Sequence, residues 1–380
     1  MTRLARRFLA AVLLVAAFGA AAAAHAQTAR RSDAARAAAP DSAASVAAEA
    51  PDSGWLFVLP VVAYSPETKF AFGASAGRYY RFSDDPDARP TTTSPLLLVT
   101  TNKQLIAGLF TDAWWDHDRW HLVANLNYTR FPTEFYGVGD DTPESAEETF
   151  EPRTGALNFE LQRRVAGAAY LGGILDIKHT DVRGVEPGGL LDGGDITGAD
   201  GGLLLGVGAA ASWDSRDSVF WPTGGWFSRV AVVRYLDALG GEHAYTWTDA
   251  SVSRYWGLGH GWVLAGNLSG SLQTGGDVPF YQLNRLMLRG YFEERYRDRH
   301  VVRARTELRL PVRGRLGAVV FAGVGELAST VGGLRLDEAR PSGGAGLRFN
   351  VGGEDKAHLR LDFGWGDGDS GVYIRFGEAF

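Results

Sequence analysis

One segment near the end of the chain, residues 301–310, alternates strictly between two kinds of side chain. Arg303, Arg305, Glu307 and Arg309 share one face, and Val302, Ala304, Leu308 and Leu310 share the other. A strict period of two predicts a β-strand with two different faces. Four charged side chains cannot lie against a dry core without a large desolvation cost, whereas the opposite face is apolar enough for lipid. The segment therefore predicts a strand of a transmembrane β-barrel, with a polar lumen on one side and the bilayer on the other.

Strand-like segments follow one another from Ser53 to the end of the chain. Segments 120–130 and 357–366 alternate clearly, whereas 225–237 and 243–256 are ambiguous. An even number is expected when both ends of a bacterial barrel are periplasmic. The expected fold is all-β, a sixteen-stranded antiparallel transmembrane β-barrel. The sixteen segments lie near 55–64, 69–82, 95–103, 105–115, 120–130, 153–164, 168–180, 200–213, 225–237, 243–256, 261–273, 301–311, 315–326, 341–351, 357–366 and 371–380.

Strand direction assigns each connection to one end of the barrel. Short connections such as 165–167 and 312–314 fall on the periplasmic end, and the longest ones fall on the outer end. This asymmetry is typical of outer-membrane barrels. The exceptions are the longer inner connection 83–94 and the tight outer turn 65–68. The long outer loops are 131–152, 181–199, 274–300 and 327–340.

The chain begins with features of a secretory signal, assigned to residues 1–26. Arginines precede an apolar run, and Ala24-His25-Ala26 resembles a cleavage site. A membrane-anchoring helix is the alternative, although the run is at the short edge of the roughly 17–25 residues that spanning requires. Residues 27–52 lack apolar periodicity and are expected to form a disordered periplasmic leader, with a short amphipathic helix as the alternative. The barrel is expected to occupy residues 53–380.

Composition excludes several classes of function. The formal charge of −6 argues against a nucleic-acid partner. The absence of cysteine excludes disulfides, thiolate metal sites and a lipid-modified N-terminal cysteine. The 12% of aromatic residues and the 49 glycines suit a lipid-facing sheet with tight turns, although soluble all-β proteins are also glycine-rich.

No motif predicts catalysis, a cofactor or a metal. The histidines do not fall at metal-ligand spacing, and no serine is marked as a nucleophile, so we expect a protein that is not an enzyme. One outer loop is acidic, and a solvated loop is its simplest interpretation, with divalent cations bridging it to lipopolysaccharide as the alternative. Its carboxylates are Asp140, Asp141, Glu144, Glu147, Glu148 and Glu151.

Three motifs in the second half of the chain resemble those of the BamA/TamA-like outer-membrane superfamily, the bacterial surface antigen family. Leu288-Arg289-Gly290-Tyr291 resembles the V-R-G-F/Y loop motif of the family. The turn from Asp214 through Arg216, Asp217 and Pro222 to Gly224 is similar to D-x-R-D…P-T-x-G. Segments 307–311 and 321–325 resemble the strand pair E-x-x-x-P and F-x-D-x-G. The resemblance covers Trp213 to Phe380 well. Segments 60–68 and 135–139 also resemble the corresponding segments of barrel-only relatives.

The resemblance implies that the loop around Arg289 folds inward and is clamped against the strand wall. Its guanidinium would pair with Glu307, which the alternation points into the lumen, while Gly290 and Tyr291 complete the loop motif. The second acid of the family, the Asp of F-x-D-x-G, is Gly323 here, so the clamp is expected to have one acid. The alternative is a solvated loop arginine.

The resemblance also implies a role in outer-membrane biogenesis, assisting the insertion or translocation of proteins or lipids. The family's periplasmic transport-associated domains need far more than residues 27–52, so a barrel-only member is expected. The site of action would be a weak seam between segments 55–64 and 371–380, with Gly377 weakening the last strand. Phe380 resembles the aromatic C-terminal signal of such barrels, although Glu378 interrupts the apolar face.

The expected location is the outer membrane of a Gram-negative bacterium. The expected partners are outer-membrane lipids, lipopolysaccharide and other envelope proteins. The alternative function is a passive pore or a structural barrel, because a lumen of this size is wide enough for water. Inward arginines would make such a pore favour anions. They are Arg303, Arg305, Arg309, Arg348 and Arg360.

Overall fold

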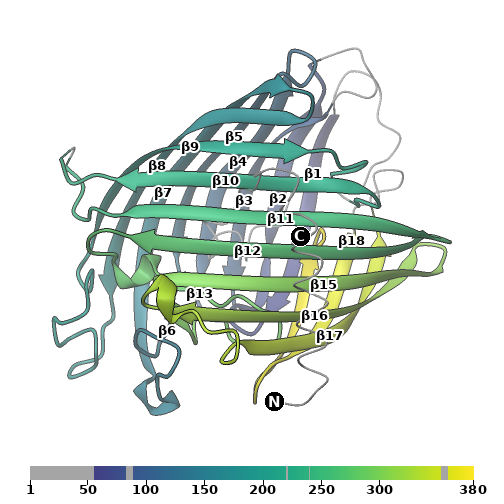
Figure 1. Ribbon diagram of the computed structural model, residues 1–380. Coiled ribbons are helices and arrows are strands. Elements are labelled where there is room, and N and C mark those ends of the chain that lie inside the picture. The colour runs from purple at the N-terminus through teal and green to yellow at the C-terminus, as the bar shows by residue number, and fades with distance from the viewer. Residues whose placement is uncertain (1–54, 83–88, 220, 239, 352–357) are drawn as a thin grey trace.

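The computed structural model describes residues 55–82, 89–219, 221–238, 240–351 and 358–380. The predicted signal and leader lie outside the described residues. Within them, sixteen strands form one closed antiparallel barrel, which confirms the predicted fold class (Figure 1). The wall strands are β1 (Trp55–Ser65), β2 (Lys69–Tyr80), β3 (Thr91–Thr100), β4 (Leu105–Trp115), β5 (Trp120–Arg130), β7 (Glu148–Ala166), β8 (Ala169–Arg183), β9 (Gly201–Asp214), β10 (Gly225–Tyr235), β11 (Thr246–Gly259), β12 (Trp262–Thr274), β15 (His300–Arg313), β16 (Leu316–Ala328), β17 (Arg340–Asn350), β18 (His358–Trp365) and β19 (Ser370–Phe376).

Short strands and 3₁₀ helices lie at the end of the barrel that carries the long loops. The strand β6 (Thr133–Phe135) pairs with β7, and β13 (Asn284–Arg285) pairs with β14 (Arg297–Asp298). Three short 3₁₀ helices are η1 (Glu144–Ala146), η2 (Phe280–Gln282) and η3 (Val331–Gly333). No helix in the described part of the chain is long and apolar enough to cross a membrane.

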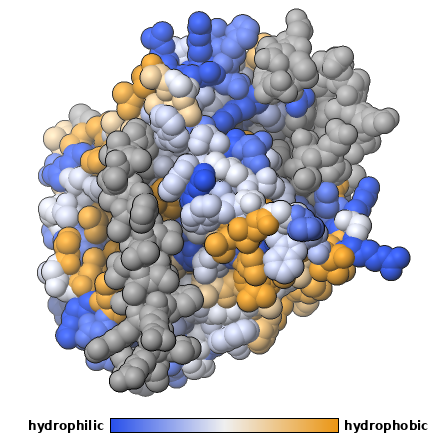
Figure 2. All heavy atoms as spheres, turned by 45° about the vertical axis from the view of Figure 1, so that its right-hand side comes forward, coloured by the Kyte–Doolittle hydropathy of each residue, from blue (hydrophilic) through white to orange (hydrophobic). Residues whose placement is uncertain are grey.

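The barrel wall is polar inside and apolar outside, as strand β18 illustrates. Leu361, Phe363 and Trp365 are 44–50% exposed, whereas Arg360 and Asp362 are buried. A soluble protein places these residue types the other way round. Hydrophobic residues are exposed in patches on the outer surface (Figure 2). The predicted alternation is therefore present, and it suits an outer face that contacts lipid.

The barrel closes where the first and last strands meet. Strands β1 and β19 pair at one position among the described residues, Tyr64 opposite Ile374. By contrast, β18 and β19 pair from Leu359 opposite Phe376 to Trp365 opposite Ser370. Among the strands as described, the seam is therefore the least extensively paired junction of the wall.

The prediction that Gly377 and Phe380 belong to the last strand is wrong. Strand β19 ends at Phe376, and Gly377 adopts φ +77°, a left-handed conformation that turns the backbone away from the strand. Phe380 packs instead against Tyr255, Val263 and Ala265 on β11 and β12. The C-terminal residues thus leave the wall at the short-turn end and cross toward the opposite strands.

Candidate functional site

The connection between β12 and β15, residues 275–299, folds inward and is called the clamp loop here. Its base is the short β13–β14 pair, and its tip carries the motif around Arg289. Leu286, Leu288 and Tyr291 are buried with Val301 and Leu327 of the wall. Apolar contacts of this kind anchor the tip independently of its charges.

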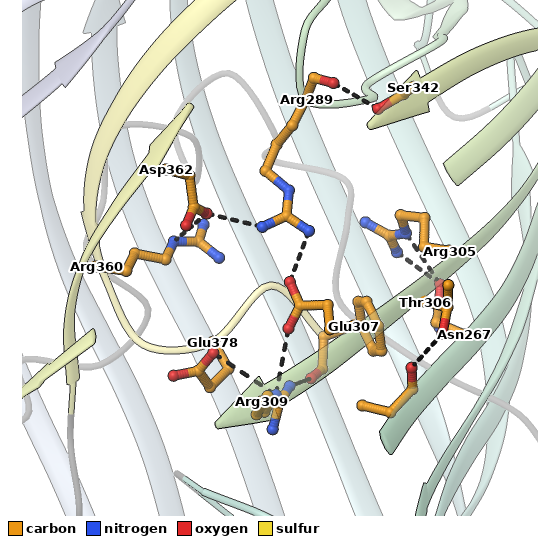
Figure 3. Close-up of polar contacts among 12 residues, drawn as sticks. Asn267, Arg289, Arg305, Thr306, Glu307, Arg309, Ser342, Arg360, Asp362 and Glu378 are labelled. Atoms are coloured by element: carbon orange, nitrogen blue, oxygen red, sulfur yellow. Dashed lines mark hydrogen bonds and ion pairs between the residues drawn. The ribbon is translucent and has the colours of Figure 1, made fainter. Parts of the chain in front are cut away.

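Arg289 lies between two carboxylates of the barrel wall (Figure 3). Its Nη2 donates to Glu307 Oε1 at 2.6 Å, and its Nη1 donates to Asp362 Oδ2 at 2.7 Å. The guanidinium also lies 3.4 Å from the centroid of the Phe321 ring. A planar guanidinium can donate in two directions at once while stacking on an aromatic face, which an ammonium group cannot do.

The expectation of a single acid for Arg289 is wrong, because Asp362 of β18 supplies the second. Gly323, at the position of the family's aspartate, lies next to Leu288: a Cβ there would be 3.3 Å from Leu288 Cδ2. The tip of the clamp loop therefore occupies the space beside β16. The second carboxylate comes from a different strand and binds the same guanidinium.

Arg289 belongs to a larger cluster of charged side chains inside the barrel (Figure 3). Arg309 Nε donates to Glu307 Oε2 at 3.2 Å, and Arg348 Nη1 donates to Asp362 Oδ1 at 2.5 Å. The side chains of these four wall residues are fully buried. The complete charge cluster is Arg289, Arg309, Arg348 and Arg360 with Glu307, Asp362 and Glu378.

Glu378 gives the C-terminal segment a defined place in the charge cluster. Its carboxylate accepts from Arg348 Nε at 3.0 Å and lies 3.8 Å from Arg309 Nε and 3.6 Å from His358 Nδ1. The residue that interrupts the apolar pattern of the sequence is thus an ion-pair partner inside the barrel. Removing one member of such a buried cluster leaves the others uncompensated, which is strongly destabilising.

Gly290 brings the clamp loop against the last two strands. It adopts φ +109°, and a Cβ added to it would lie 2.3 Å from the carbonyl carbon of Trp365. Its backbone N–H donates to the Tyr373 hydroxyl at 3.0 Å. The Tyr291 hydroxyl donates to the Pro341 carbonyl at 2.6 Å and accepts from the Asp367 N–H. Only glycine combines this φ with such close approach.

Glu293 ties the clamp loop to both sides of the seam. Its N–H donates to Glu67 in the β1–β2 turn at 3.0 Å, and Arg375 of β19 donates to its carboxylate at 3.0 Å. Burial, together with the neighbouring charge of Glu293, raises the pKa of Glu67 to about 7. The loop therefore spans the junction at which β1 and β19 are least paired.

The family turn motif forms a separate site between β9 and β10, at the opposite end from the long loops. Arg216 donates to both oxygens of Asp214, each at 2.9 Å, and its guanidinium lies 4.3 Å from the Phe227 ring centroid. Asp217 accepts from the N–H and hydroxyl of Thr223. Burial opposes ionisation of Asp217, but these hydrogen bonds hold its pKa below the usual value.

Trp221 links the turn motif to the charge cluster. It lies directly before Pro222 and three residues before Gly224. The Trp221 ring lies 5.1 Å from the Arg309 guanidinium and 4.2 Å from the His358 ring. The turn thus contacts the lower part of the charge cluster, whereas Gly377 and Phe380 take no part in the seam.

Sequence reasoning missed the participation of Asp362 and Glu378. A signal for Asp362 exists, because the alternation of β18 places it on the inner face beside Arg360. Gly364 follows on the same face, and the clamp-loop backbone lies over it: a Cβ there would be 2.9 Å from the Arg289 carbonyl carbon. No comparable signal marks Glu378, whose position depends on the turn at Gly377.

Comparison with known proteins agrees with this architecture. The model of the Omp85 superfamily domain matches residues 89–380. The structure is similar to BamA from Haemophilus ducreyi lacking POTRA domains 1–3, with a TM-score of 0.60 and 15% identity, over 86% of this chain and 70% of that one. It is also similar to CdiB from Acinetobacter baumannii, with a TM-score of 0.53 and 11% identity, over 86% of this chain and 60% of that one. No curated protein matches the chain.

Proposed function

This chain belongs to the Omp85 superfamily, and on that premise we propose that it is an outer-membrane biogenesis barrel. It assists the insertion or translocation of proteins or lipids, without catalysing a covalent reaction. The observation that carries the proposal is the seam, where β1 and β19 pair at Tyr64 and Ile374 alone among the described residues. A strand edge with few hydrogen bonds is a template for another strand.

The clamp loop supports this proposal because it contacts β19 on one side of the seam and the β1–β2 turn on the other. Glu67 precedes β2 and contacts Glu293, while Tyr373 and Arg375 of β19 contact Gly290 and Glu293. Few backbone hydrogen bonds join β1 and β19 as described, and contacts of the clamp loop bridge the β1–β2 turn and β19. Such a seam can open without the loss of a continuous ladder of backbone hydrogen bonds. The loop position then sets how readily β1 and β19 separate.

The passive anion pore receives less support from the site. Arg309, Arg348 and Arg360 are engaged with carboxylates of the charge cluster, so they do not form a free cationic wall. The clamp loop also lines a lumenal cavity of about 140 Å³ through Gln282, Asn284 and other residues. A loop that occupies the lumen opposes a large, steady current.

A disulfide across the seam tests the proposal. The chain has no cysteine, so Tyr64→Cys with Ile374→Cys introduces one defined pair between β1 and β19. We expect oxidation to abolish rescue of outer-membrane integrity in cells that lack the native copy, and reduction to restore it. The readout is exclusion of a large antibiotic.

The matched control keeps the Ile374 substitution and moves its partner. Leu361 lies opposite Ile374 within the continuous β18–β19 pairing, so Leu361→Cys with Ile374→Cys locks a junction that need not open. We expect this pair to retain function when oxidised. Unchanged integrity with the seam locked contradicts the proposed role.

The proposed setting is the outer membrane of a Gram-negative bacterium, and the match to the Omp85 superfamily domain supports it. The exposed apolar residues of the wall contact lipid, and the long loops face the lipopolysaccharide leaflet. Other envelope proteins are the proposed partners at the short-turn end, where the turn motif and the C-terminal segment lie.

A further inference from the structure

Three carboxylates gather at the loop end of the barrel, away from the charge cluster. Asp140 lies in the connection between β6 and β7, Glu326 lies near the end of β16, and Glu338 lies in the connection to β17. One carboxylate oxygen of each residue lies within 4.8 Å of those of the other two. Like charges at this separation repel one another unless a proton or a cation intervenes.

Glu326 is the buried member of this group of carboxylates. The residue is only 4% exposed, and its carboxylate makes no hydrogen bond or ion pair within 4 Å among the described residues, although the charge of Arg340 acts on it from further away. Its nearest acidic neighbours carry the same charge. An ionised carboxylate in this position is strongly unfavourable without a counter-charge.

Arg340 is close enough to Glu326 for its charge to favour the ionised carboxylate, but its hydrogen bond and ring contact are made elsewhere. Arg340 Nη2 donates to the backbone carbonyl of Asp140 at 2.6 Å, and its guanidinium lies 4.0 Å from the Tyr296 ring centroid. Arg335 Nη1 pairs with Glu338 Oε1 at 2.8 Å, but its side chain is 59% exposed. Exposed ion pairs are weak, so this contact does not prevent Glu338 from binding a cation.

We propose that Asp140, Glu326 and Glu338 form a Ca²⁺ site. Carboxylate oxygens are hard ligands, and Ca²⁺ accepts six to eight oxygens in irregular geometry, with water completing the shell. The group contains no thiolate or imidazole, which softer metals prefer. The bound ion ties the connection before β7 to β16 and to the β16–β17 loop, three segments that are distant in sequence. The proposal goes beyond the biogenesis role and does not depend on it.

Calorimetric titration of the purified full-length protein in detergent tests the site. After removal of metals with EDTA, we expect one Ca²⁺ per chain, with Kd on the order of 10⁻⁴–10⁻³ M or tighter, as in extracellular modules. Mg²⁺ should bind more weakly, because it demands near-ideal octahedral geometry. Glu326→Gln should weaken Ca²⁺ binding by about tenfold or more.

The control is Asp195→Asn, which removes an exposed carboxylate of the connection between β8 and β9 that is not one of the three ligands. It should change Kd by less than about twofold. Thermal unfolding gives a second readout: Glu326→Gln should raise Tm in EDTA, and only the wild type should gain Tm when Ca²⁺ is added. No binding by the wild type, equal binding by Glu326→Gln, or tighter binding of Mg²⁺ overturns the proposal.

Discussion

The backbone N–H of Gly290 donates to the hydroxyl of Tyr373 at 3.0 Å, and this contact joins the clamp loop to the last strand. It places the Arg289 motif beside the seam as well as against the wall. The loop therefore has two sets of contacts, one with the charge cluster and one with the β1–β2 turn and β19. Each set can be perturbed separately.

Gly290→Ala should displace the tip of the clamp loop. The added Cβ would meet the Trp365 carbonyl carbon at 2.3 Å, and φ +109° is unfavourable for alanine. We expect faster protease cleavage of the loop in folded protein and a loss of stability above the roughly 1–3 kcal/mol of backbone strain alone. Gly188→Ala is the control, since Gly188 has φ +78° but a Cβ there would meet nothing within 4 Å. Equal effects of the two substitutions would show that close approach at Gly290 is unimportant.

Arg289→Ala and Glu307→Ala should each destabilise the barrel by about 3–5 kcal/mol, because each leaves buried charges uncompensated. The double variant should be little worse than either single variant. Arg289→Lys should recover only part of the loss, since an ammonium group cannot serve Glu307 and Asp362 in fork geometry.

Denaturant unfolding in detergent measures the free energy of unfolding of the wild type, the two single variants and the double variant. Arg335→Ala is the control, because Arg335 makes only exposed ion pairs with Asp337 and Glu338 and should cost less than about 1 kcal/mol. Strict additivity of Arg289→Ala and Glu307→Ala would contradict the pairing as an energetic unit.

The contacts of the clamp loop with the seam should weaken as pH rises through about 7. Burial, and then the charge of Glu293, raise the pKa of Glu67 from 4.5 to about 7, while Arg375 opposes the shift. A folded-state pKa above the unfolded one means that stability is greatest below about 4.5 and declines as pH rises through 7. After correction for the base-catalysed rise in intrinsic exchange, the protection factors of the loop amides should therefore be lower at pH 8 than at pH 6.

Glu67→Gln tests the origin of this dependence. The amide keeps an oxygen that can accept from the Glu293 N–H but cannot ionise. We expect the variant to lose most of the difference in protection factor between pH 6 and pH 8. The same difference in the variant would assign the effect to another group.

The clamp loop should restrict ion flow through the lumen. The wild-type protein in a planar bilayer is expected to pass small, flickering currents, because the loop lines the lumenal cavity. Replacing residues 286–296 with a short glycine-serine linker should give a larger and steadier current. A large, steady, anion-selective current from the wild type would favour the pore instead.

The sequence predicts the wall of this barrel better than its interior. Alternation identifies the strands and the inward direction of Glu307 and Asp362, because these depend only on the period of each strand. It cannot identify Asp362 as a partner of Arg289, since that contact depends on where a long loop meets a strand 73 residues away. Strand ends are also poorly predicted: β7 begins at Glu148, five residues before the predicted start at 153, where it pairs with β6.

The end of the chain shows a second limit. Residues 371–380 look like one strand, yet Gly377 turns the backbone and Glu378 enters the charge cluster. The Glu378 carboxylate is stabilised by pairing with arginines inside the barrel, whereas on the outer face it would be desolvated against lipid without a partner. The position of Glu378 can be predicted only when the positions of Arg309 and Arg348 are known, and these residues come from strands that are not adjacent to one another.

The composition of the charge cluster has a consequence for the order of folding. Every member comes from the segment 289–378, so the C-terminal strands can form their buried ion pairs before the N-terminal strands take their places. The contacts of Glu67 with Glu293 and of Tyr64 with Ile374 join the most distant parts of the chain and carry the highest cost of loop closure. Closure of the barrel is therefore expected to be the last step of assembly, and it takes place on a C-terminal half that is already organised.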